Sequence, residues 1–167
     1  MKKIIHNQNA WLGLAFLMMA ILFYSSSQTY AEQSQQSNLH HFLKQEPGES
    51  FFAQFKVMYA GEMHDASKDY FGYVEFLIRK AAHFSIYFLM GLGLFNGLKN
   101  RIQQWGLSII IAYLAATGYA GLDEFHQMLT GGRTPLFQDV ILDSMGALTA
   151  ILLASLVMLI QKGRKKL

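Results

Sequence analysis

Four long apolar segments constrain the fold of this chain more than any other feature of its 167 residues. They cover about residues 10–27, 81–98, 105–122 and 140–160. An apolar segment of roughly 18 residues or more can cross a hydrocarbon core about 30 Å thick. Only 15% of the residues are charged, whereas about 25% are charged in soluble domains. The sequence therefore predicts an all-α, polytopic membrane helix bundle with four transmembrane helices, in a single domain.

Basic residues are divided unevenly between the two sides of this predicted bundle. If the N-terminus is inside, all eleven acidic residues fall on the outer side or at its membrane edge. Because Lys and Arg favour cytoplasmic loops, we expect a multi-pass protein of the bacterial cytoplasmic membrane with both termini in the cytoplasm. The net charge of +3 then reflects topology and contact with anionic lipids, and predicts no nucleic-acid partner. The inner side holds eight basic residues, which are Lys2, Lys3, Lys99, Arg101, Lys162, Arg164, Lys165 and Lys166.

The first apolar segment has two interpretations. Two lysines precede it and Thr29-Tyr30-Ala31 follows it, as in a cleavable secretory signal. Trp11 and Tyr24 instead resemble the interfacial anchors of a retained helix. We expect residues 1–31 to be retained, and cleavage stays the alternative.

The predicted external loop, residues 28–79, divides into two parts. Residues 28–48 are polar and rich in glutamine, which indicates a connecting loop. Aromatic and methionine residues then recur at helical spacing from about Glu49 to Tyr59, and a second aromatic segment covers residues 70–78. Both are too short or too charged to span, so we expect amphipathic interfacial helices that cover the external mouth of the bundle. A lid or a lipid-contacting platform is the functional alternative.

The second span carries polar side chains at its outer end. Lys80, His83 and Tyr87 are spaced i, i+3 and i+7, so they share one helix face. Lys80 has an alternative role in extending its ammonium group to the interface. His83 is expected to face the bundle interior or a polar cavity, as a structural or a functional group. Further in, Gly93 and Gly97 suit close helix contact.

The third span becomes polar at its outer end. Asp123, His126 and Gln127 can lie on one side of the last helical turns, whereas Glu124 is expected to point somewhat away. The segment from Thr130 to Arg133 contains two glycines and predicts a tight turn.

The fourth span is expected to begin before its apolar run. Thr134 suits a helix N-cap and Pro135 the first helical position. Asp139 and Asp143 then lie one turn apart, on the face continued by small residues. We expect this face to pack against the neighbouring helices with its carboxylates turned toward a common pocket. The small residues are Gly146, Ala150 and Ala154.

Taken together, these motifs resemble the VanZ-like family of small bacterial membrane proteins, named after an accessory factor in teicoplanin resistance. The resemblance covers all four spans and implies a role at the cell envelope in susceptibility to lipoglycopeptides. The family more often has asparagine where this chain has Asp143. The matching motifs are Phe23-Tyr24-Ser25-Ser26-Ser27-Gln28, Lys80-x-x-His83-x-x-x-Tyr87 with Gly91 and Gly93, Asp123-Glu124-x-His126-Gln127, and Gly132-Arg133 ahead of Asp139-x-x-x-Asp143-x-x-Gly146.

The polar residues support several kinds of site. We expect a pocket at the outer leaflet that binds or modifies a lipid-linked envelope component or a lipoglycopeptide, with the lipid bilayer as the other partner. The candidate binding residues are Lys80, His83, Tyr87, Asp123, Glu124, His126, Gln127, Arg133, Asp139 and Asp143.

Three alternatives to a binding pocket stay open. The first is an intramembrane enzyme that acts on a lipid head group by acid–base chemistry. The second is a divalent metal site, because the sequence offers suitable ligand types in His83, Asp123, His126, Asp139 and Asp143. Their spacing matches no metal signature, so we assign no metal ligands. The third is a structural ion-pair network with no ligand. We expect no cofactor. The catalytic candidates are His83, Asp123, Glu124 and His126.

Overall fold

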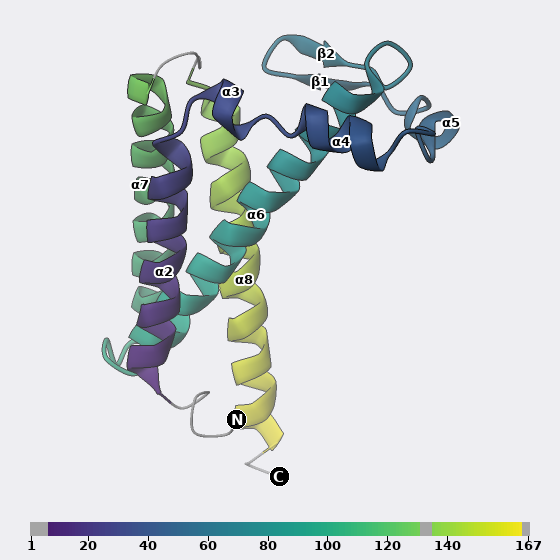
Figure 1. The fold of residues 1–167 in the computed structure, drawn as a ribbon. Helices are drawn as coiled ribbons and strands as arrows, with labels where there is room; N and C mark the ends of the chain where they lie inside the picture. Colours follow the sequence, from purple (N-terminus) through teal and green to yellow (C-terminus); the bar gives the residue numbers. More distant parts are fainter. Residues whose placement is uncertain (1–6, 131–134, 165–167) are drawn as a thin grey trace.

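Four long helices form the body of the molecule (Figure 1). The computed structural model describes residues 7–130 and 135–164. The long helices are α2 (Gln8–Ser26), α6 (Tyr70–Leu98), α7 (Trp105–Thr130) and α8 (Phe137–Arg164). Each lies on one of the predicted apolar segments, which confirms the all-α bundle.

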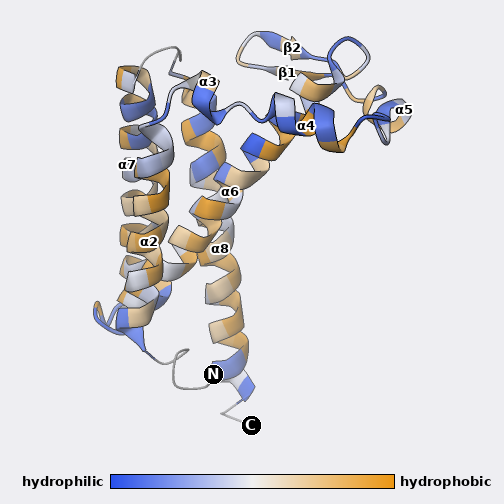
Figure 2. Cartoon of the chain, viewed as in Figure 1, coloured by the Kyte–Doolittle hydropathy of each residue, from blue (hydrophilic) through white to orange (hydrophobic). Residues whose placement is uncertain are grey.

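The surface of the bundle is apolar over most of its height. Figure 2 shows hydrophobic residues along the four helices and hydrophilic ones gathered at the ends. Large apolar side chains such as Phe16, Leu114 and Leu152 are more than half exposed. All four helices are long and apolar enough to cross a membrane, and a water-soluble bundle would bury such side chains. The chain therefore has the form of a multi-pass membrane protein.

Helix α6 is the centre of the packing and contacts the other three long helices. It crosses them obliquely (Figure 1), and glycines allow the close approach. A Cβ atom on Gly91 would lie 2.6 Å from the carbonyl oxygen of Ala147 in α8, and one on Gly93 would lie 2.7 Å from that of Trp11 in α2. The small-residue pair predicted at Gly93 and Gly97 thus packs against α2.

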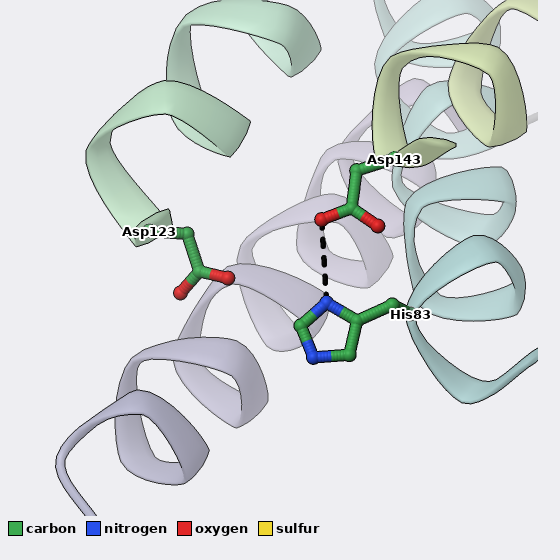
Figure 3. Close-up of side chains that lie close together, drawn as sticks. All are labelled: His83, Asp123 and Asp143. Atoms are coloured by element: carbon green, nitrogen blue, oxygen red, sulfur yellow. Dashed lines mark hydrogen bonds and ion pairs between the residues drawn. The ribbon is translucent and has the colours of Figure 1, made fainter. Parts of the chain in front are cut away.

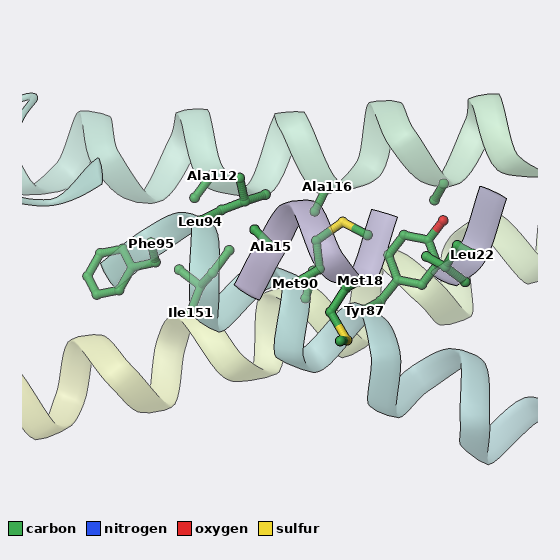
Figure 4. Packing of buried hydrophobic residues seen from close by; sticks show 12 residues of the cluster. Ala15, Met18, Leu22, Tyr87, Met90, Leu94, Phe95, Ala112, Ala116 and Ile151 are labelled. Atoms are coloured by element: carbon green, nitrogen blue, oxygen red, sulfur yellow. The ribbon is translucent and has the colours of Figure 1, made fainter. Parts of the chain in front are cut away.

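The bundle core combines large side chains from α2, α6 and α8 with small ones from α7 (Figure 4). Helix α2 supplies Ala15, Met18 and Leu22, all buried. Helix α7 presents a stripe of alanines that lets its neighbours pack closely. Helix α2 therefore supplies part of the core that the other helices share.

The loop between α2 and α6 lies at one end of the bundle, around the first turns of α6, and we call this end the loop end (Figure 1). The loop contains α3 (Tyr30–Gln33), α4 (Gln36–Phe42), α5 (Glu49–Phe52) and an antiparallel hairpin of β1 (Val57–Tyr59) and β2 (Glu62–His64). The hairpin turns at Ala60 and Gly61, which both have positive φ. A second small core of Ala66, Tyr70 and Tyr73 holds the loop against α6.

The loop differs from its predicted form in three respects. The polar connector contains α3 and α4, and Tyr59 belongs to a strand rather than to a helix. Residues 70–78 form the first turns of α6 instead of a separate interfacial helix, because the Asp69 side chain caps α6 by accepting the Gly72 N–H at 2.9 Å.

The fourth long helix begins before its apolar run, as predicted, but at Phe137 rather than at Pro135. The backbone N–H of Leu136 donates to Glu124 of α7, at 2.6 Å, so residue 136 belongs to the connection between the helices. The proposed N-cap Thr134 and the turn at residues 131–133 lie outside the described residues.

Candidate functional site

A cavity of about 540 Å³ lies at the loop end, between the hairpin and helices α6, α7 and α8. Three of the predicted site residues line its lower part, namely Lys80 and His83 of α6 and Asp139 of α8. Glu124 and Gln127 of α7 also reach it. Five of the predicted site residues therefore line one cavity at this end of the helices.

Lys80 and Asp139 form an ion pair across the cavity, with side chains 14% and 20% exposed. The Tyr59 hydroxyl of the hairpin donates a hydrogen bond to the same carboxylate, and the Lys80 ammonium lies 4.4 Å from the centre of the Tyr59 ring. Burial, and then the hydrogen bond to Asp139, raise the pKa of Tyr59 above its ordinary value, so the phenol stays neutral and donates. This contact joins α6, α8 and the hairpin.

Glu124 faces the cavity, contrary to the expectation that it points away. Its carboxylate is partly buried and accepts the backbone N–H of Leu136. Glu124 therefore fixes the entry into α8 as well as lining the cavity.

Below the cavity, one side chain from each of three helices meets in what we call the inner cluster: His83 of α6, Asp123 of α7 and Asp143 of α8 (Figure 3). The Nδ1 atom of His83 lies 3.2 Å from Oδ2 of Asp143. One ligand atom from each of the three residues lies within 4.8 Å of the other two. Asp123 and Asp143 are 4% and 3% exposed, so His83 is the member that lines the cavity.

Two further side chains hold Asp123 in place. Ser26, the last residue of α2, donates its hydroxyl to Oδ1 of Asp123 at 2.5 Å. Gln127, one turn along α7, donates to Oδ2 at 3.3 Å. Thr130 also donates to the carbonyl of Ser26, at 2.7 Å. The predicted site omitted Ser26, although it continues the buried stripe of Ala15, Met18 and Leu22 at helical spacing.

Two predicted site residues in the described part of the chain neither line the cavity nor belong to the inner cluster. His126 packs its ring against Phe23 of α2, with the ring centres 4.7 Å apart, and it does not line the cavity. Tyr87 is completely buried in the bundle core. Arg133 lies outside the described residues.

The upper rim of the cavity contains residues that the sequence did not predict, namely Glu75 of α6 with His64 and Asp65 of the loop. Glu75 accepts the backbone N–H of Gln35 at 2.7 Å. The His64 ring stacks on Phe76 with centres 3.9 Å apart. Burial, and then the nearby charges of Arg79 and Lys80, lower the pKa of His64 below its ordinary value, so it is neutral at physiological pH.

Asp65 is an acidic member of the same rim. The hydroxyl of Ser67, and then the ammonium of Lys56 at 3.1 Å, hold the pKa of Asp65 at about 2. This carboxylate is therefore ionised throughout the physiological range.

These features define a class: a four-span helical membrane protein with a polar cavity at one end of the bundle and a His–Asp–Asp cluster beneath it. A family model described as VanZ/LLP1 matches residues 11–159, nearly the whole chain. The chain belongs to the VanZ/LLP1 family. No curated protein and no solved structure matches it.

Proposed function

We propose that the cavity binds the polar head group of a membrane-anchored amphiphile, either a lipid-linked envelope component or a lipoglycopeptide. The observation that carries this proposal is a cavity of about 540 Å³ placed directly above helices whose sides face lipid. Pockets for small molecules have volumes of about 300–1,000 Å³. A ligand anchored in the membrane would reach the cavity with its head group while its acyl chain stays between lipids.

The lining suits a head group that carries hydroxyls and charge. Carboxylates such as Glu75 and Asp139 accept from sugar hydroxyls, while Tyr59 and Phe76 offer flat apolar faces. Lys80 is already paired with Asp139, so an anionic group would have to compete with that carboxylate. Lys68 and Arg79 also line the cavity and add positive charge to its rim.

The distribution of Lys and Arg supports an outer position for the loop end. In that orientation, the cavity opens at the leaflet where lipid-linked envelope precursors and lipoglycopeptides are found. Membership of the VanZ/LLP1 family supports the further proposal that the protein contributes to teicoplanin resistance.

Binding can be tested on the purified protein in lipid nanodiscs. We expect teicoplanin to bind, and a glycopeptide without an acyl chain to bind less tightly. Asp139→Asn should weaken teicoplanin binding by about tenfold, the effect of roughly 1.4 kcal/mol, because it removes one of the polar contacts of the cavity. Lys44→Ala, at an exposed site away from the cavity, is the control and should bind normally. Equal affinity in the wild type and in Asp139→Asn would contradict the cavity as the site.

The inner cluster favours a second candidate, an intramembrane enzyme acting on a lipid head group. Asp143 contacts Nδ1 of His83, and a carboxylate in that position orients an imidazole so that its other nitrogen acts as a general base. We expect His83→Gln to abolish head-group release from envelope lipids. His126→Gln changes a histidine outside the cluster and should leave release intact. If the wild type releases no head group, the protein is a binder rather than an enzyme.

A further inference from the structure

We propose that His83, Asp123 and Asp143 form a binding site for a divalent transition-metal ion, Zn²⁺ or Mn²⁺. Each of these side chains comes from a different helix, and one ligand atom of each lies within 4.8 Å of the other two. Nitrogen and oxygen ligands bind Zn²⁺ at about 2.0–2.2 Å in tetrahedral geometry, so two ligands of one ion lie about 3.4 Å apart. A contraction of about an ångström, within reach of side-chain rotation, would bring all three into one coordination shell.

The chemistry of the donors fits this class of ion. One imidazole with two carboxylates is a mixed nitrogen and oxygen set, which suits Zn²⁺ or Mn²⁺ better than Ca²⁺ or Mg²⁺, which prefer oxygen alone. Asp123 is also fixed by Ser26 and Gln127. Hydrogen bonds of this kind orient metal ligands and commonly accompany metal sites.

The charge of the cluster is an independent argument for a cation. Both carboxylates are almost fully buried, and buried charges require a partner. Among the residues that the structure describes, His83 is the one basic side chain in an ion pair with either of them. A divalent ion would supply the positive charge that one imidazole cannot.

An unsatisfied polar atom at the same place points to a missing partner. The Oδ1 atom of Asp143, on a side chain that is 5% exposed, has no hydrogen-bond partner in the described part of the chain. Buried polar groups are nearly always paired, and bidentate coordination by Asp143 would satisfy its second oxygen.

The cavity gives the ion a path of entry. His83 lines the cavity floor, whereas the two carboxylates lie behind it. Three protein ligands leave at least one coordination position for water or for an anionic group in the cavity, as in catalytic zinc sites. Metal binding does not depend on the proposed head-group ligand, so each proposal can fail without the other.

The test measures metal directly in the full-length protein purified in detergent. Metal analysis after growth with added zinc and manganese should find about one ion per chain, and chelator-treated protein should rebind it. Asp143→Asn preserves side-chain size but removes a charged ligand, so affinity should fall at least about tenfold, and Ser26→Ala should lower it by about tenfold through Asp123. Glu62→Gln changes an acid of the cavity rim and should bind normally.

Two further measurements keep the test decisive. Gel filtration and circular dichroism identify variants that do not fold, and if Asp143→Asn is one of them, Ser26→Ala and His83→Gln decide the question. X-ray absorption of the loaded protein should show a histidine nitrogen bound to the metal, and that signal should disappear in His83→Gln. The proposal is overturned if the wild type binds neither ion, or if folded cluster variants bind as tightly as the Glu62→Gln control.

Discussion

Ser26 illustrates how one small side chain can hold a buried charge. It is 1% exposed, and its hydroxyl donates to Asp123 at 2.5 Å. Ser26→Ala leaves that carboxylate with one donor fewer in a site that water does not reach freely, so we expect a loss of about 1–3 kcal/mol of stability. Thermal unfolding in detergent would measure it. Ser27→Ala is the matched control, since its hydroxyl is exposed and bonds within its own helix. Equal stability of the two variants would contradict the structural role of Ser26.

His64 gives the loop a defined pH dependence. Its pKa in the folded protein is lowered from 6.5, mainly by burial. Below about pH 6.5, His64 of the unfolded chain therefore takes up a proton that His64 of the folded loop does not bind. The free energy of unfolding falls as pH falls from about 6.5 to the lowered pKa. Hydrogen exchange of the hairpin at about pH 7.5 and about pH 5.5 should show this loss. His64→Phe keeps the ring stacking and should flatten the dependence, whereas the exposed His41→Gln should leave it unchanged. An unchanged slope in His64→Phe would show that another group is responsible.

At the residue scale, the sequence predicted the types of side chain in the site better than their directions. Asp123 and Gln127 continue the buried alanine stripe of α7, and His126 does not, so the small-residue spacing could have separated them. Glu124 lies on the flank of the same helix, and its direction depends on the course of the connection to α8. That connection follows from tertiary packing, which local spacing does not determine.

At the element scale, the crossing of α6 and α8 positions His83 beside Asp143. The two helices approach closely at Gly91, where a Cβ atom would lie 2.6 Å from the backbone oxygen of Ala147. Gly91→Ala should therefore force the helices apart and cost about 1–3 kcal/mol of stability. Gly118→Ala, where a Cβ atom would contact nothing, should be neutral or stabilising, because alanine favours helix over glycine by about 1 kcal/mol. Unfolding curves in detergent separate these outcomes, and equal stability would contradict the close crossing.

The elements that the sequence predicted least well are those of the loop. Apolar length alone locates the long helices, since a membrane imposes one simple requirement on each. The hairpin was missed because the aromatic residues before it match a helical period, while the turn signal is a single Gly61 after Ala60. The pairing of Val57 with His64 across the hairpin cannot be predicted from the spacing of apolar residues along the chain.

At the scale of the whole molecule, the fold has two levels with the cavity between them. The lower level is the bundle, whose sides face lipid and whose core contains the inner cluster at its loop end. The upper level is the loop, held to α6 by its own small core. The apolar and polar composition of the sequence predicted that a membrane bundle and an external loop exist. The sequence predicted a pocket at this end but not the upper lining of the cavity, where Tyr59 and His64 of the hairpin lie opposite Lys80 and Glu124.

The orientation of this two-level molecule is testable because the chain has no cysteine. Single cysteines at Glu62 in the hairpin and at Asn100 between α6 and α7 would occupy exposed positions at opposite ends of the bundle. The excess of Lys and Arg on the α6–α7 side predicts that this side is cytoplasmic. A membrane-impermeant maleimide should therefore label Glu62→Cys in intact cells and Asn100→Cys only after permeabilisation. The reverse pattern would turn the cavity toward the cytoplasm and remove lipoglycopeptides from its ligands, whereas the geometry of the inner cluster would be unaffected.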